Sequence, residues 1–254
     1  MRFTERDLEK FAYPLNDSRI AEGKRIFWDI VSSCQAMGYI AVDKLINNDI
    51  SAAAFSIVMQ RASNLLYIFM GGGYAKNTAA AQGEKPLLFI YTDTDADALA
   101  DELLTRLSPT YGTLVLTKGM ITGAGISVII DNIPKLSGDD ISYAKFPTVE
   151  KIKLCAQKNR ATDYSFKKVI RIAKSLCHAF AGEKSACAMI YASEMEELLE
   201  QLPTEDYLRY DSLRLKCHYI FLRLHNCIEQ KHIICKNPVA CKDLLLDFIN
   251  ALEN

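Results

Sequence analysis

The chain has 254 residues, of which 50% are apolar and 24% are charged, and its formal net charge is −1. This length suits one large domain or two smaller ones that share a core. The near-zero net charge excludes a long-range positive potential that would attract nucleic acid or an anionic membrane. Because no run reaches about 18 apolar residues and the opening segment MRFTERDLEKF is charged, we expect a cytoplasmic protein without membrane contact.

The first two elements are predicted to be helical. Residues 4–16 predict a short helix and then an extended stretch, since Pro14 ends any helix before it. Residues 17–39 predict a long amphipathic helix that is capped by Asp17 or Ser18, because the apolar side chains recur at helical spacing.

Two buried strands flank a glycine-rich turn. The segment 51–63 is compatible with a helix or with the start of a strand. The apolar run NLLYIFM at 64–70 predicts a buried strand that ends at three glycines, and KPLLFIYTD at 85–93 predicts a second strand.

A helix is predicted next, over residues 94–112. Thr94 or Asp95 is the expected N-cap, and acidic side chains fill the first turns. Pro109 and Gly112 are expected to follow the end of this helix.

The remaining pattern changes from strands to helices. TLVLTKG at 113–119 and GISVIIDNI at 125–133 predict a pair of strands joined through MITGA. From about Thr148 onward four segments have helical periodicity, at 164–182, 185–203, 210–231 and 240–253. The sequence therefore predicts an α+β fold, with a small mixed sheet and flanking helices over 1–147 and a helical half packed on it over 148–254.

Several motifs, in order along the chain, resemble one known family. FMGGGYAKNTAA at 69–80 resembles the glycine turn of the polymerase-β-type nucleotidyltransferases, and most closely that of the bacterial relatives of cyclic GMP-AMP synthase, the CD-NTases. The segments RFTERDLEKFAYPLNDSR, YSFKKVIRIAKSLCHAF and IYASEMEELLEQLP resemble further parts of that family. The resemblance implies a nucleotidyltransferase core, and it suggests a role in bacterial antiviral (anti-phage) defence.

The turn has a physical rationale, because residues without a Cβ let backbone N–H groups approach a phosphate. In the family a lysine on a later helix also approaches the bound nucleotide. The nucleotide-binding residues expected on this basis are Gly72, Gly73, Tyr74, Thr78, Lys85, Arg171 and Lys174.

Catalysis in this family needs carboxylates that hold magnesium ions, which neutralise charge and activate the attacking hydroxyl. The resemblance places an Asp-x-Asp pair on the strand after the turn. In this chain those positions are Lys85 and Leu87, and a shift of one residue gives Glu84 and Pro86, which restores a single acid. The sequence therefore predicts that the acid pair is lost.

The third acid of the family would fall near Ser127, and Asp131 is too far along the strand to replace it. Asp93 and Asp95 have the right spacing for a metal-binding pair. They come at the far end of the predicted strand, however, and eight extended residues span about 25 Å. We interpret them as a strand exit and a helix N-cap. We therefore expect no catalytic residue and no metal ligand among these positions.

Basic residues cluster before and within the predicted helix at 164–182. A solvated surface is the expected role, and a local anion-binding or RNA-binding surface is the alternative. These residues are Lys158, Arg160, Lys167, Lys168 and Arg171. The four histidines, His178, His218, His225 and His232, have no spacing that indicates a catalytic triad.

The chain has eight cysteines and no CxxC pair. In a reducing compartment most are expected to be small core residues. One segment, HNCIEQKHIICKNPVAC, gathers His225, Cys227, His232, Cys235 and Cys241, and such ligands can close a zinc site. The spacing matches no tight zinc knuckle, so we expect less than stoichiometric zinc, and any bound zinc in the 225–241 segment is expected to be structural.

The sequence thus predicts a degenerate, non-catalytic nucleotidyltransferase-like protein, with no cofactor, that binds a nucleotide, a short oligonucleotide or a protein partner. One alternative is an active nucleotidyltransferase that makes a cyclic or linear oligonucleotide with magnesium. A second alternative is a pure protein-interaction module.

Overall fold

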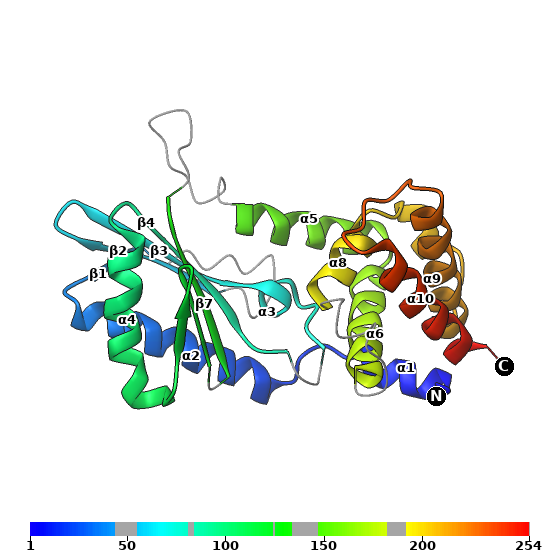
Figure 1. The fold of residues 1–254 in the computed structure, drawn as a ribbon, viewed down its shortest axis with the longest axis horizontal. Helices are drawn as coiled ribbons and strands as arrows, with labels where there is room; N and C mark the ends of the chain where they lie inside the picture. The colour runs from blue at the N-terminus through cyan, green and yellow to red at the C-terminus, as the bar shows by residue number, and fades with distance from the viewer. Residues whose placement is uncertain (44–54, 81–83, 124, 134–146, 182–191, 254) are drawn as a thin grey trace. The chain divides into compact units, whose positions relative to one another are not determined.

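The computed structural model describes residues 1–43, 55–80, 84–123, 125–133, 147–181 and 192–253 (Figure 1). The chain divides into two compact units. The sheet unit comprises Leu15–Asn77 and Glu84–Leu154, and the helical unit comprises Met1–Pro14, Thr78–Gly83 and Cys155–Asn254. The N-terminal segment thus groups with the helical unit, while the predicted boundary after residue 147 stays a prediction.

The described part of the sheet unit forms a seven-stranded sheet in the order β1-β2-β3-β4-β7-β6-β5. Strands β4 and β7 are parallel and the other neighbours are antiparallel, so the predicted mixed sheet is confirmed. The strands are β1 Ile40–Asp43, β2 Ser56–Arg61, β3 Asn64–Gly71, β4 Leu87–Thr92, β5 Val115–Thr117, β6 Met120–Gly123 and β7 Ile126–Asn132.

Three helices belong to the sheet unit, namely α2 Asp17–Ala36, α3 Gly72–Lys76 and α4 Ala96–Tyr111. Helices α2 and α4 pack against each other, and α4 packs against β7 (Figure 1). On one face of the central strands Ile68, Met70, Leu88, Ile90 and Val128 are all buried. These alternate positions form the apolar layer of the sheet unit, as the strand periodicity predicts.

Four local expectations need correction. The N-cap of α2 is Asn16, whose side chain accepts a hydrogen bond from the Arg19 N–H. Pro109 lies inside the last turn of α4, which continues to Tyr111, rather than after the end of the helix. The linker MITGA is mostly a strand, β6, which lies between β5 and β7. Helix α5, Pro147–Ala161, was not predicted.

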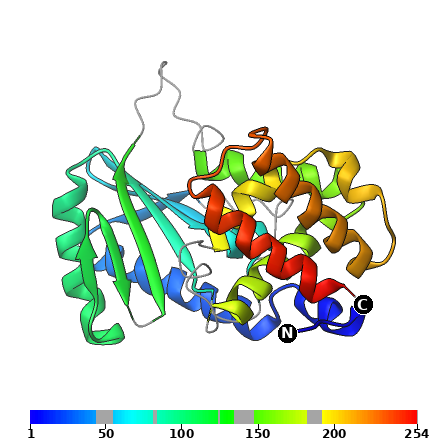
Figure 2. The same cartoon turned by 45° about the vertical axis from the view of Figure 1, so that its right-hand side comes forward.

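The helical unit has one continuous apolar core, which includes Leu8, Phe166, Phe221 and Phe248. Figures 1 and 2 show α9 and α10 side by side in this unit. The predicted helices are confirmed where the structure describes them, and residues 185–191 of one lie outside the described residues. The elements are α1 Glu5–Ala12, the C-terminal part of α5, α6 Ser165–Phe180, α8 Ala192–Glu200, the 3₁₀ helix η2 Thr204–Leu208, α9 Leu213–Glu229 and α10 Pro238–Leu252.

Candidate functional site

The glycine turn joins β3 to α3. Gly72 has a φ of 57°, a left-handed conformation that favours glycine. A Cβ on Gly71 would lie 2.3 Å from the ring of Phe89, and one on Gly72 would lie 3.4 Å from the Cβ of Leu87. Packing against Phe89 of β4 therefore explains the glycine at 71, and the left-handed backbone explains the glycine at 72, both independently of any bound phosphate.

The register of the sheet fixes what lies beside this turn. Leu87 pairs with Gly71 of β3 on one side and with Ser127 of β7 on the other. Paired residues point to the same face of a sheet. At the row where the resemblance expects metal ligands, the three neighbouring strands therefore present a glycine, a leucine and a serine.

Aromatic side chains continue this face. The rings of Phe89 and Tyr91 are stacked, with centroids 6.3 Å apart, and the rings of Tyr67 and Phe69 are stacked at 6.5 Å. Val149 of α5 packs into the same cluster. An apolar surface of this kind does not ligate magnesium, which prefers carboxylate oxygens and water.

Three further acids that the sequence raised, Asp93, Asp95 and Asp131, have structural roles or lie away from the turn. The Asp93 carboxylate accepts a hydrogen bond from the Leu65 N–H, at the end of β3 remote from the glycine turn. The Asp95 carboxylate accepts from two N–H groups of the first turn of α4, which confirms the N-cap interpretation. Asp131 pairs with Tyr91, further along the sheet than Leu87 and Ser127. None of these acids is adjacent to the turn.

Tyr74 of α3 is buried beneath α2. A Cβ on Gly23 would lie 3.1 Å from the Tyr74 ring, so α2 passes close to it. The Arg19 guanidinium lies over the same ring at 5.8 Å and donates a hydrogen bond to the Glu84 carbonyl. Burial raises the pKa of the Tyr74 hydroxyl. These contacts give Tyr74 and Arg19 a structural role in anchoring the start of the β4 segment.

In the helical unit, Lys174 belongs to a buried polar network. Its Nζ lies 2.6 Å from Oε2 of Glu196, and the Thr78 hydroxyl donates to the same oxygen at 3.0 Å. Lys174 is 1% exposed and Thr78 is fully buried. The structure thus joins Thr78 and Lys174, two positions that the family resemblance singled out, through Glu196. The predicted part of Thr78 and Lys174 in nucleotide binding stays a prediction.

The basic cluster forms a solvated surface only in part. Arg160 and Lys168 are exposed as expected, and the other three residues correct that expectation. Arg171 is buried, donates from Nε to the Ala12 carbonyl at 2.6 Å, and has its pKa lowered to about 10 by burial. Lys158 donates to the carbonyls of Glu200 and Leu202, and Lys167 is also buried. The Lys158 and Arg171 side chains thus hold segments of the helical unit together.

Of the potential zinc ligands in the 225–241 segment, the structure brings only Cys235 and Cys241 together. The Sγ atoms of Cys235 and Cys241 lie 2.7 Å apart, and a carboxylate oxygen of Glu194 on α8 completes a group of three within 4.8 Å. His232 is exposed, and among the described residues neither it nor Cys227 joins this group. The sequence offered no signal for Glu194, because it comes from a distant helix.

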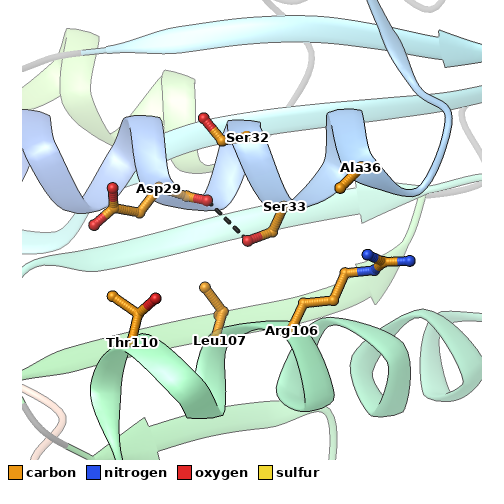
Figure 3. A pocket seen from close by; sticks show the side chains of 7 residues that line it. All are labelled: Asp29, Ser32, Ser33, Ala36, Arg106, Leu107 and Thr110. Carbon is orange, nitrogen blue, oxygen red and sulfur yellow. Dashed lines mark hydrogen bonds between the residues drawn. The ribbon is translucent and has the colours of Figure 1, made fainter.

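A pocket of about 420 Å³ lies between α2 and α4 of the sheet unit (Figure 3). Three of its polar side chains, those of Asp29, Ser33 and Arg106, already have local partners. The Ser33 hydroxyl donates to the Asp29 carbonyl, the Asp29 carboxylate binds Arg25 and the Tyr111 hydroxyl, and Arg106 pairs with Glu102. This pocket therefore has the character of a helix–helix groove rather than of a binding site.

Comparison with known proteins identifies the fold. No family model and no curated protein sequence matches the chain. A cyclic dinucleotide synthase CdnE from Elizabethkingia meningoseptica, solved with GTP and Apcpp, superposes with a TM-score of 0.70 at 13% identity, covering 100% of both chains. The CdnE c-UMP-AMP synthase of Rhodothermus marinus, solved with Apcpp and Upnpp, gives 0.65 at 10% identity, covering 98% of this chain and 96% of that chain. CdnC of E. coli MS115-1, in a complex with HORMA-deltaN, gives 0.55 at 15% identity, covering 94% and 84%.

At sequence identities this low, the superpositions show a shared fold. They confirm the resemblance to the CD-NTases that the sequence motifs predicted. The chain therefore has the α+β fold of these cyclic dinucleotide synthases. In the described part of the chain no helix combines the length and hydropathy needed to cross a bilayer.

Proposed function

We propose that this chain is a nucleotidyltransferase-fold protein that binds a nucleotide or a short oligonucleotide without transferring it. The observation that carries the proposal is the row formed by Gly71, Leu87 and Ser127, where the resemblance calls for metal-binding acids. Phosphoryl transfer of this class depends on divalent cations, and this row has no carboxylate to hold one.

The only acid between Gly71 and Pro86 is Glu84. A single carboxylate of this kind does not replace the three acids of the family, which together hold the divalent ions that the transfer needs. The half-exposed Phe89 ring, which packs over Gly71, further limits the room for a hydrated cation beside the turn.

Binding is supported by the retained glycine turn and by Lys85. Lys85 is exposed and lies two positions before Leu87, so its ammonium group introduces positive charge near the row of Gly71, Leu87 and Ser127. A cation on the protein can attract phosphate oxygens without a metal ion. Such a site lacks the charge of magnesium, so the binding is expected to be weak and sensitive to salt.

Calorimetric titration with each nucleoside triphosphate, in the presence and absence of a chelator, tests this function. We expect binding that persists with chelator and weakens in Lys85→Glu. The control is Lys118→Glu, which makes the same charge change on an exposed lysine between β5 and β6, at the edge of the sheet.

Two results would contradict the proposal. Binding that disappears with chelator would show that a metal site survives, and would favour an active enzyme. The absence of binding for every triphosphate and short oligonucleotide, with the protein still folded, would favour a protein-interaction module.

A further inference from the structure

A group of three potential metal ligands lies inside the helical unit, on segments that are far apart in the sequence. Glu194 comes from α8, Cys235 from the connection between α9 and α10, and Cys241 from the first turns of α10. One ligand atom from each lies within 4.8 Å of the others. Three different segments thus converge on one point.

The Glu194 carboxylate is the most informative member of this group. Glu194 is 8% exposed, and its Oε1 has no hydrogen-bond partner among the described residues. A buried polar atom without a partner is costly, and native proteins seldom leave one unexplained. Because this carboxylate stands beside two sulfur atoms, a cation between the three groups would satisfy it.

The position of Cys235 is fixed by neighbouring contacts. The Gln201 side chain, just beyond α8, donates to the Ile234 carbonyl and accepts from the Ile234 N–H, each at 3.3 Å. These two bonds tie the chain next to Cys235 to the end of the helix that carries Glu194. Cys241 is fully buried on α10. The ligand atoms are therefore brought close together. The two Sγ atoms lie 2.7 Å apart and must separate by about 1 Å to bind zinc, because Zn–S bonds of about 2.3 Å in a tetrahedron hold the sulfur atoms about 3.8 Å apart.

From this geometry we infer that Glu194, Cys235 and Cys241 bind a zinc ion. Two thiolates and a carboxylate are a soft and charged set that suits zinc better than magnesium or calcium, which prefer oxygen ligands alone. A divalent cation also offsets most of the negative charge that the three groups carry when they are deprotonated. With three protein ligands, water completes the tetrahedron.

The role assigned to this ion is structural. It links α8, α10 and the connection that precedes α10, and so it stabilises the folded helical unit by binding that state in preference to the unfolded chain. This inference is independent of the nucleotide proposal, since every ligand belongs to the helical unit.

Metal analysis of the full chain, purified with a reductant and dialysed against metal-free buffer, tests the site. In place of the less than stoichiometric zinc expected from the spacing of the sequence alone, we expect about one zinc ion per chain in the wild type. Cys235→Ala and Cys241→Ala should lose it, and Glu194→Gln should weaken zinc retention at least about tenfold in competition with a chromophoric chelator. Cys227→Ala and His232→Ala are matched controls, because they remove potential ligands from the same segment that the geometry leaves out, and they should retain zinc.

Chelation of the wild-type protein separates metal binding from a folding defect in the variants. A strong chelator should lower the thermal unfolding midpoint, and added zinc should restore it. In Cys241→Ala the chelator should change nothing. Cobalt substitution should give a thiolate-to-metal charge-transfer band in the wild type that Cys241→Ala lacks.

Two outcomes would overturn the zinc assignment. Metal-free wild-type protein, with free thiols and an unfolding midpoint insensitive to zinc, would mean that the group binds no ion. Protein prepared without reductant that holds no zinc and has a mass lower by two hydrogens, with Cys235 and Cys241 linked, would assign the pair to a disulfide instead.

Discussion

Leu87 of β4 lies directly opposite Ser127 of β7, in a parallel pair that places both side chains on one face of the sheet. The same residue pairs with Gly71 on its other side. The resemblance to the CD-NTases expects carboxylates at this place, and the chain has none there. The expectation that the chain lacks catalytic activity therefore depends on which residues pair in these three strands, and not on the overall fold.

Purified protein should make no cyclic or linear oligonucleotide from the four ribonucleoside triphosphates with magnesium or manganese. The physical reason is that no carboxylate lies at the row of Leu87 and Ser127 to hold the divalent ions that the reaction needs. Chromatography of the reaction mixture provides the measurement. A product that forms in the wild type and vanishes in Asp93→Ala or Asp95→Ala would show that these acids serve in catalysis.

Gly71→Ala should destabilise the protein by about 1–3 kcal/mol, the usual cost of overpacking. The added methyl group would lie 2.3 Å from the Phe89 ring. Urea unfolding measures the loss, and the Phe89→Leu background is the control. If the clash with the ring is the cause, the same glycine substitution should cost less in that background, whereas an unchanged cost would point to the backbone alone.

Glu196→Ala should lower the free energy of unfolding by about 3–5 kcal/mol, because it leaves the Lys174 ammonium buried without its carboxylate at 2.6 Å. The double variant Lys174→Met/Glu196→Leu should be less destabilised than Glu196→Ala, since it buries no unpaired charge. Chemical denaturation of both proteins measures the difference. A loss in Glu196→Ala within about 0.5 kcal/mol, typical of surface positions, would show that the pair is not a structural contact.

Stability should fall at high pH partly through Tyr111. Burial and the hydrogen bond to the Asp29 carboxylate raise the pKa of the Tyr111 hydroxyl to about 12. Between the usual tyrosine pKa of about 10 and this value, the folded protein holds more protons than the unfolded chain, so stability decreases as pH rises. Below pH 10 the contribution is fully present.

The measurement is the urea midpoint between pH 9 and 12 for the wild type and for Tyr111→Phe, a range that brackets the reference pKa of about 10. The wild-type midpoint should fall more steeply, because the variant has no hydroxyl to titrate at this position. Parallel curves would mean that the hydroxyl titrates equally in the folded and unfolded states.

Local patterns in the sequence determined most of the secondary structure. Apolar runs at β3 and β4 and helical periodicity at α2, α4, α6, α9 and α10 were sufficient, because each element buries a face whose spacing is set by its own backbone geometry. The Asp95 cap was also predictable, since its partners lie within the first turn of α4. The motif order along the chain was enough to indicate the CD-NTase fold.

Only the tertiary structure decided which distant residues meet. It showed that Lys174 is paired with Glu196, that Phe89 packs over Gly71, and that Glu194 joins Cys235 and Cys241. No periodicity within one segment encodes such contacts, because they depend on strand register and on helix packing across long separations in the chain. The sequence therefore predicted most of the elements, and the folded chain determined which charges are buried and which potential ligands converge.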